Sequence, residues 1–322
     1  MSGFLFRRFA GSLVLLLLVL TATFVLLRLI PGDPTNFAED QRLPLETREN
    51  LRRIYGLDRP LPEQYVRWLS AVVLRGELGV SYSQKRPVSA VLLEAIPATA
   101  ILASAALAVE CFAALLLGVA AARRHGSGLD HSIRVGTLLL FSVPAFWSGL
   151  MAILLFSYVW PILPASHMHS VDADRMSAFG RLLDLGWHLI LPATILGLAN
   201  AGGTARFVRA SVLGVMNQDY IRTARAKGLT ERRVVWVHGM RNALPPLIQV
   251  LALSLPALLS GSLITEVVFS WPGMGRLTFN AISMRDYPLV LGAVAFSAVM
   301  VILGNFLADI LHALSDPRAR HG

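Results

Sequence analysis

The chain has 322 residues, of which 55% are hydrophobic and only 15% are charged, and its formal net charge is +9. Because a typical soluble domain is about 25% charged, this composition excludes an ordinary soluble protein and indicates one embedded in a membrane. The single cysteine, Cys111, excludes a disulfide framework and a cysteine-based metal site. The positive charge does not indicate nucleic-acid binding, because the sequence does not interleave aromatic residues with exposed cations on a soluble face.

Six apolar stretches follow one another along the chain: 9–27, 99–122, 135–161, 185–205, 242–265 and 287–308. A helix of about 20 apolar residues crosses the hydrocarbon of a bilayer. We therefore predict an all-α polytopic membrane protein with six transmembrane helices. Arg7 and Arg8 before the first stretch are also compatible with a signal peptide. Its length, and the lack of a convincing cleavage site after it, favour a retained helix.

Basic residues predict the orientation of these helices. If the amino terminus is cytoplasmic, the inside segments carry fifteen Arg and Lys residues against four acidic ones, whereas the loop 31–97 carries nine of each sign. Cytoplasmic loops of membrane proteins hold the excess of Lys and Arg. We therefore predict that both termini are cytoplasmic.

Residues 1–30 are expected to form the cytoplasmic amino terminus and the first transmembrane helix, and residues 31–94 an outside, periplasmic loop. Arg28 either extends from the helix end to the lipid head groups or is a buried functional arginine, and we favour the lipid head groups. In the loop, five apolar residues share one face of a predicted helix: Tyr65, Trp68, Leu69, Val72 and Val73. Such a helix rests on the membrane surface or forms part of a platform for an external partner, and we favour the membrane surface.

The predicted transmembrane domain spans residues 95–314, with a cytoplasmic tail at 315–322. Pro144 predicts a kink in the third helix. In the outside segment that follows, His167 and His169 are more typical of solvated side chains than of metal ligands, because no nearby acidic or cysteine residue completes a site.

The inside loop 206–241 carries eight cations, and its pattern predicts short helices. Asn217 is a candidate N-cap, Gly228 a candidate C′ glycine, and Thr230 a candidate cap for a second helix that runs to about residue 243. The first of these helices has only about two turns, so we expect it to need packing against a partner. The alternative is an ordinary basic loop that only sets the topology.

Residues 219–229, followed by His238 and residues 241–245, resemble the coupling loop of binding-protein-dependent ABC transporter permeases, in particular the dipeptide, oligopeptide and nickel branch. Further stretches agree with that branch, at 31–34, 56–61, 79–82, 266–277, 285–288 and 316–318. The broader pattern begins Glu-Ala-Ala, where this chain has Arg222, Thr223 and Ala224. The resemblance leaves open whether Asp219 takes over the capping role of that glutamate.

The resemblance implies a type I ABC importer fold in a bacterial inner membrane. Its partners would be a second permease subunit, in a heterodimer, two ATP-binding subunits, an external solute-binding protein and membrane lipids. The residues implied to contact the ATPase are Asp219, Arg222, Thr223, Ala224, Arg225, Ala226, Lys227, Gly228 and Leu229. No phosphate-binding loop of the Gly-x-x-x-x-Gly-Lys-Ser/Thr type occurs in the sequence, so ATP and magnesium are expected in the partner ATPase, and no cofactor in this chain.

Polar side chains inside the predicted helices are candidates for the transport pathway or for contacts between helices: Glu110, Ser254, Ser260, Ser262, Thr265, Glu266, Asn305 and Asp309. An acidic group at the centre of a membrane helix costs about 2.5–3.5 kcal/mol on insertion scales. We therefore expect Glu110 to face protein or to be protonated, and we favour a hydrogen bond between helices over a substrate contact. Small hydroxyl residues are also usual packing groups between membrane helices.

The function predicted from these features is a permease subunit of an ATP-driven importer, not an enzyme, since no nucleophile–base pair or carboxylate cluster is present. The main alternative is a secondary transporter or channel without an ATPase, which would show inverted repeats or broken helices around an ion site at the membrane midplane. An intramembrane enzyme is a weaker alternative. The resemblance covers carriers of dipeptides, longer peptides, nickel chelates, glutathione and some oligosaccharides, so the cargo stays open.

Overall fold

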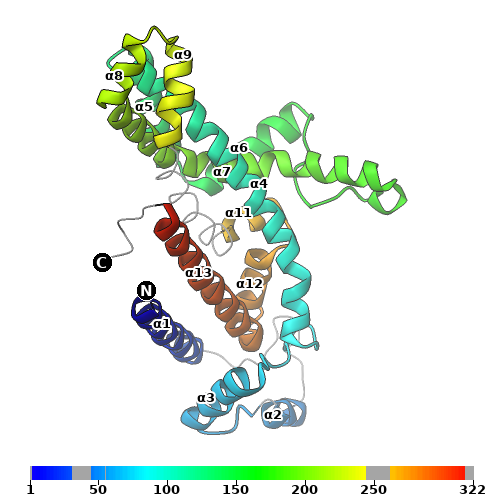
Figure 1. Ribbon diagram of the computed structural model, residues 1–322. Helices are drawn as coiled ribbons and strands as arrows, with labels where there is room; N and C mark the ends of the chain where they lie inside the picture. The colour runs from blue at the N-terminus through cyan, green and yellow to red at the C-terminus, as the bar shows by residue number, and fades with distance from the viewer. Residues whose placement is uncertain (1, 31–44, 55, 244–261, 316–322) are drawn as a thin grey trace. The chain divides into compact units, whose positions relative to one another are not determined.

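The computed structural model describes residues 2–30, 45–54, 56–243 and 262–315. Apart from an isolated bridge between Val80 and Pro87, the regular structure of these residues is helical (Figure 1). The chain forms two compact units, one of residues 1–99 and 272–302, the other of residues 100–271 and 303–322. The predicted all-α class is confirmed in the part of the chain that the structure describes.

The first unit is built around α1 and the starts of two long helices. It contains α1 (Ser2–Leu29), α2 (Leu45–Ile54), α3 (Leu61–Ser70), the π-helical turn η1 (Ala71–Arg75), the start of α4 (Val88–Arg123), α12 (Met274–Ser283) and the start of α13 (Tyr287–Ser315). Its core joins Phe24 of α1 to Val88 and Leu92 of α4 and to Leu289 of α13. The burial of these apolar side chains holds three segments together that are far apart in the sequence.

Part of the apolar face of α3 packs against the core of the first unit. Tyr65 and Trp68 pack against the core of the first unit, with ring centroids 5.3 and 5.6 Å from that of Phe24. The Tyr65 hydroxyl also lies 2.6 Å from the Thr21 hydroxyl of α1. The expectation that the whole stripe rests on the membrane is therefore wrong for Tyr65 and Trp68, because aromatic rings pack favourably against one another. Val73 remains exposed.

A buried carboxylate fixes the segment before α4 to the start of α13. Asp286 is fully buried, and its Oδ2 accepts hydrogen bonds from the Ser81 hydroxyl (2.5 Å), the Ser83 hydroxyl (2.7 Å) and the Ser83 backbone N–H (2.9 Å). Its Oδ1 accepts from the backbone N–H of Leu289 at 3.2 Å. Several donors compensate for the cost of burying the carboxylate.

The second unit contains the remainder of α4 and of α13 and the elements between them. These are α5 (Gly128–Ser142), α6 (Ala145–Ile153), η2 (Leu154–Val159), η3 (Ala173–Arg175), α7 (Ala178–Met216), α8 (Asp219–Ala226), α9 (Glu231–Arg233), η4 (Val234–Gly239) and α11 (Leu263–Val268). Small residues let its long helices approach closely: Ala114 and Val119 of α4 pack with Ala205 and Val208 of α7. Such contacts between small residues are typical of membrane helices.

Four described helices are long and apolar enough to cross a membrane: Ala10–Leu29 within α1, α4, α7, and Tyr287–Phe306 within α13. A fifth candidate is the pair formed by α5 with α6 and η2, which is bent by 94° at its break. The predicted fifth helix, 242–265, lies mostly outside the described residues, so the number of six helices stays a prediction. The described helix α4 begins at Val88, earlier than the expected stretch 99–122.

The kink predicted at Pro144, inside the apolar stretch 135–161, is confirmed as a break between α5 and α6. The chain is helical from Gly128, Val143 is extended, and a new helix starts after Pro144. A residue before proline is disfavoured in the helical conformation. The break is therefore encoded by the proline, whereas the 94° bend depends on how the two halves pack.

Candidate functional site

Helix α8 follows α7 directly and contains most of the residues implied to contact an ATPase. Gln218 is extended and occupies the N-cap position, and α8 begins at Asp219. The prediction of Asn217 as N-cap is wrong by one residue, because Asn217 still has the helical conformation and ends α7. Asp219 lies in the first turn as expected, where a carboxylate interacts favourably with the helix dipole.

Helix α8 ends in a Schellman motif at Gly228. The Gly228 N–H donates to the Arg225 carbonyl at 2.9 Å, and the Leu229 N–H donates to the Ala224 carbonyl at 3.4 Å. Gly228 has a φ of +76°, a left-handed conformation that favours glycine. The prediction of Gly228 as the C′ residue is therefore confirmed.

One face of α8 packs on its own chain. Ile221 and Ala224 are buried against Val234 of η4, with Met216 and Leu229 at the edges of this cluster. The expectation that the helix needs a partner in order to be ordered is wrong, because the chain itself supplies the apolar contacts. Among the implied ATPase-contacting residues, Ala224 is buried, with only 6% of its surface exposed, and Leu229 is half-buried.

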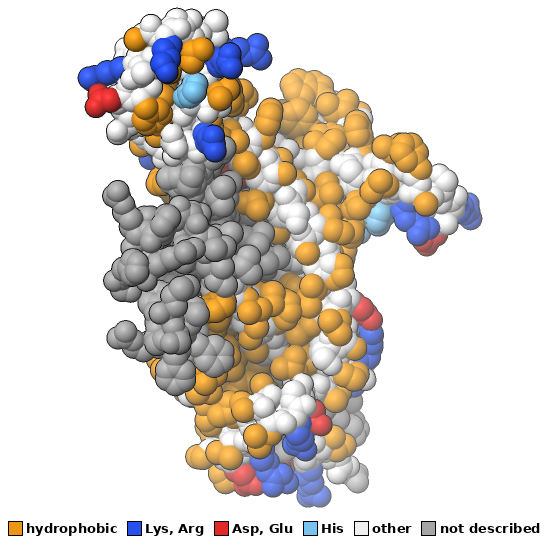
Figure 2. All heavy atoms as spheres, in the orientation of Figure 1, with side chains coloured by type: hydrophobic (Ala, Val, Ile, Leu, Met, Phe, Trp, Pro, Cys, Tyr) orange, Lys and Arg blue, Asp and Glu red, His pale blue; other side chains and the backbone are white. Residues whose placement is uncertain are grey.

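The opposite face of α8 is exposed and charged. The side chains of Asp219 and Arg222 are 97% and 73% exposed, and they form an ion pair of 3.5 Å. Thr223, Arg225, Ala226, Lys227 and Gly228 are also exposed. Figure 2 shows Lys and Arg side chains gathered on the lobe formed by α8 and α9, at the top of the view. The arrangement can bind an acidic surface, but it offers no group for chemistry.

A bidentate ion pair links α8 to α9. Arg225 Nε donates to Glu231 Oε2 at 3.1 Å, and Arg225 Nη2 donates to Glu231 Oε1 at 2.8 Å. These hydrogen bonds favour the charged forms, so they lower the pKa of Glu231 and raise the pKa of Arg225. Thr230 occupies the N-cap position of α9 as predicted, although its side chain makes no capping hydrogen bond. The pair holds the two short helices in one arrangement.

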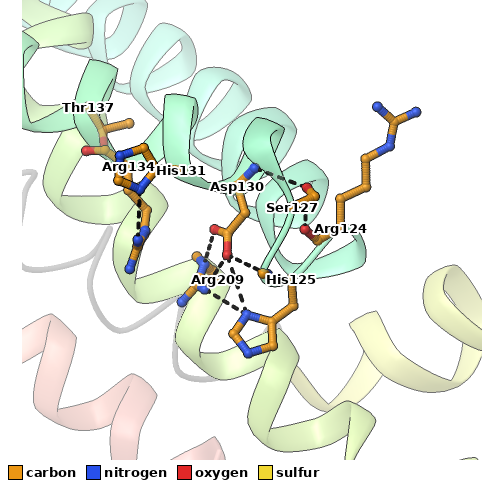
Figure 3. A network of polar contacts seen from close by, with 9 residues as sticks. Arg124, His125, Ser127, Asp130, His131, Arg134, Thr137 and Arg209 are labelled. Atoms are coloured by element: carbon orange, nitrogen blue, oxygen red, sulfur yellow. Dashed lines mark hydrogen bonds and ion pairs between the residues drawn. The ribbon is translucent and has the colours of Figure 1, made fainter.

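A second ion pair, which sequence reasoning missed, joins α7 to the start of α5 (Figure 3). Arg209 donates through Nε to Asp130 Oδ1 and through Nη2 to Asp130 Oδ2, both at 2.7 Å. Asp130 Oδ2 also accepts from the Gly126 backbone N–H at 3.0 Å, and Asp130 lies beside His125. The two charges are separated by 79 residues in the sequence, and no local pattern indicates that they meet.

The polar residues predicted inside the membrane helices have different partners. The Thr204 hydroxyl of α7 donates to Glu110 Oε1 of α4 at 2.7 Å, so the hydrogen bond between helices expected for Glu110 is present. The Ser262 hydroxyl donates to Glu266 Oε1 at 2.6 Å within one segment. The remaining candidates are not joined to these pairs by a described contact. Thr265 is buried and Asn305 exposed, Asp309 lies in α13, and Ser254 and Ser260 lie outside the described residues.

His169 has an acidic neighbour, contrary to the expectation from the sequence. Its Nδ1 lies 2.9 Å from Asp184 Oδ2, and His188 Nδ1 lies 3.4 Å from Asp184 Oδ1. Asp184 follows in α7, where the helix brings it back beside the preceding loop. Within the described residues, no group of three His, Cys, Asp or Glu side chains has the geometry of a metal site.

Two family models together match almost the whole chain. The model described as "Binding-protein-dependent transport system inner membrane component" matches residues 114–321. The model of the N-terminal part of such membrane components matches residues 1–103.

Curated relatives and a solved structure agree with these models. The chain is 36% identical over 322 residues to the oligopeptide transport system permease protein AppB of Bacillus subtilis (strain 168), with 100% of both chains covered. It is 40% identical over 336 residues to the di/tripeptide transport system permease protein DppB of Pseudomonas aeruginosa (strain UCBPP-PA14), with 100% of this chain and 99% of that protein covered. A chain of the MetNI methionine ABC transporter, solved in inward-facing conformations, matches with a TM-score of 0.53 and 16% identity over 70% of this chain and 96% of that chain. This last match concerns the fold alone.

Proposed function

Since the chain belongs to the family of binding-protein-dependent transport system inner membrane components and is a permease subunit of an ABC importer, we propose that it carries peptides and that α8 is its contact with the ATPase. The proposal of a peptide cargo is supported by the names of the relatives, which are permeases for oligopeptides and for di- and tripeptides. Dipeptides and short oligopeptides are therefore the cargo to test first.

The observation that carries the α8 assignment is the division of this helix into two faces. Ile221 and Ala224 fix it to the body of the second unit, while Arg222, Arg225 and Lys227 are exposed on its other side. A helix held by its own chain keeps its shape before a partner arrives, which lowers the entropy cost of docking. The exposed cations favour an ATPase groove with an acidic rim.

Movement of α8 would pass directly to α7, the long helix that precedes it in the chain. Two residues, Asn217 and Gln218, separate α7 from α8, and α7 extends over 39 residues. The Arg225–Glu231 pair connects α8 to α9. ATP binding in the partner subunits would draw α8 inward, and α7 would follow as a stiff element.

The complete importer in this proposal has a second permease subunit, in a heterodimer, two ATP-binding subunits that bind ATP and magnesium, and an external binding protein. In this topology, six helices cross the inner membrane with both termini cytoplasmic. Residues 31–94 form the outside loop and residues 95–314 the transmembrane domain, so α8 lies in the cytoplasm. Of the candidate pathway residues, Ser262, Thr265 and Glu266 are buried in one short segment and are the first to test.

The test is Gly228→Trp in the reconstituted importer. The indole would project from the end of α8, where a Cβ added to Gly228 meets no atom within 4 Å, and would block close approach of the ATPase. Peptide-stimulated ATP hydrolysis is expected to fall to the unstimulated rate. Gly76→Trp is the matched control, because Gly76 also has a positive φ (+66°), has no atom within 4 Å of an added Cβ, and lies in the predicted outside loop.

Normal stimulated hydrolysis by the Gly228→Trp complex would contradict the docking role of α8. Purification of the tagged permease from its native membrane provides a test of the importer itself. An ATP-binding subunit and a second permease are expected to co-purify, whereas a secondary transporter or channel would bring down neither.

A further inference from the structure

A cavity of about 660 Å³ lies in the first unit, where α1 ends. Residues from α1, α2, α3, the segment 77–82 and the start of α13 line it. Much of the wall is apolar and aromatic, with Phe24, Trp68, Leu78 and Leu291 among its members. The candidate membrane span of α1, Ala10–Leu29, ends beside this cavity, which would place the cavity at a membrane boundary.

The lining of the cavity has a strong excess of positive charge. Its charged members are four arginines, Arg28, Arg53, Arg59 and Arg67, and one acidic residue, Glu77. Figure 2 shows cations gathered over α2 and α3 at the bottom of the view. An apolar wall with several guanidinium groups is typical of a site for an anion that carries an apolar part.

Two of the arginines already share a carboxylate. Arg59 Nη1 lies 2.7 Å and Arg67 Nη2 lies 3.0 Å from the same atom, Glu63 Oε1. For Arg28 and Arg53, no ion pair with a carboxylate occurs within the described residues. These two arginines therefore carry the positive charge that an incoming anion would neutralise.

Arg28 is held in place by aromatic rings. Its guanidinium carbon lies 5.3 Å from the centroid of Phe24 and 5.3 Å from the centroid of Tyr287. Contacts with the ring faces orient the planar guanidinium group but do not accept its five N–H donors as a carboxylate or phosphate does. A half-buried, oriented arginine is a preorganised donor for a phosphate, which it can bind through two parallel hydrogen bonds.

We propose that this cavity binds the phosphate group of an anionic phospholipid, with Arg28 and Arg53 as its ligands. The head group would enter the cavity, and the glycerol and upper acyl chains would contact the apolar wall near Phe24 and Leu291. Phospholipid is the source that fits the position at the end of a membrane span. Inorganic phosphate shares the phosphate chemistry but leaves the apolar wall without a contact.

The test is native mass spectrometry of the full-length permease purified in mild detergent, titrated with phosphatidylglycerol. The wild-type chain is expected to retain one phosphatidylglycerol in preference to uncharged diacylglycerol. Arg28→Gln and Arg53→Gln are each expected to weaken this binding by about 10-fold or more, since each removes at least one charge-assisted hydrogen bond. Arg53 is exposed, so its replacement tests the site even if Arg28→Gln impairs folding.

Arg75→Gln is the matched control. Arg75 is an exposed arginine in the same region, it pairs with Glu77 at 3.4 Å, and it is not part of the cavity lining. Its replacement is expected to leave phosphatidylglycerol binding unchanged. Equal weakening by all three substitutions would overturn the proposal, because it would indicate a general surface charge effect.

Two further outcomes would also overturn the proposal. If inorganic phosphate displaces phosphatidylglycerol at equal concentration, the site recognises a free anion and not a lipid. If the wild-type chain retains no phosphatidylglycerol, the cavity does not bind this lipid.

Discussion

Replacing Gly202 by alanine tests how closely α5 and α7 must approach. A Cβ at Gly202 would lie 2.5 Å from the backbone oxygen of Thr137 in α5, and Cβ atoms in real structures essentially never approach another heavy atom closer than 3.0 Å. Because the obstacle is a backbone atom, a rotamer change cannot relieve the contact, and the helices have to separate. The neighbouring Gly203 is the control, since a Cβ there meets no atom within 4 Å.

The two substitutions have the same effect on helix propensity but a different effect on packing. Glycine in a helix interior is about 1 kcal/mol less favourable than alanine, so both variants gain the same helix propensity. Overpacking in a close contact costs about 1–3 kcal/mol, and only Gly202→Ala incurs this cost. The variants are therefore expected to differ by about 1–3 kcal/mol, with Gly202→Ala the less stable.

Thermal unfolding of the purified permease in detergent, followed by circular dichroism, measures this difference. For a chain of 322 residues we expect the Tm of Gly202→Ala to be about 1–5 °C below that of Gly203→Ala. Peptide-stimulated ATP hydrolysis by the complex should fall in the same order. Equal Tm values, or a higher Tm for Gly202→Ala, would refute the close approach of α5 and α7.

Four further substitutions test the two ion pairs and the buried carboxylate. Arg225 lowers the pKa of Glu231, so the pair stabilises the fold above the pKa of an unfolded glutamate, and this stabilisation is lost as the pH falls through the lower folded pKa. At neutral pH the free energy of unfolding of the wild type is expected to exceed that of Glu231→Gln by about 0.2–1 kcal/mol, the range of an exposed ion pair. Chemical denaturation at decreasing pH is expected to show the two stabilities becoming equal in acid. Asp286→Ala should cost about 3 kcal/mol or more, because several donors lose their acceptor, while Ser83→Ala should cost about 1 kcal/mol; equal losses would argue against the Asp286 network. Asp130→Asn is expected to lower the Tm and the stimulated ATPase rate together, and an unchanged Tm would show that its arginine pair does not support α7.

Sequence patterns were sufficient for the features that depend on neighbouring residues. The helical class follows from long apolar runs, because a membrane leaves the backbone no partner but itself. Gly228 was identifiable as a helix end because a left-handed residue after a helix is usually glycine. The resemblance of residues 219–229 to a coupling loop pointed to the family that the family models and the curated relatives then showed.

The tertiary structure decided which side of each helix is available and which distant residues meet. Ala224 looked like a contact residue from the sequence, yet it is buried against Val234, because the orientation of α8 depends on η4. Asp130 and Arg209 meet only because α5 and α7 pack together. Local sequence determines whether a segment is helical and where it ends, since those free energies arise within a few residues. The partners of a side chain depend on contacts between segments far apart in the chain, and only the folded arrangement contains that information.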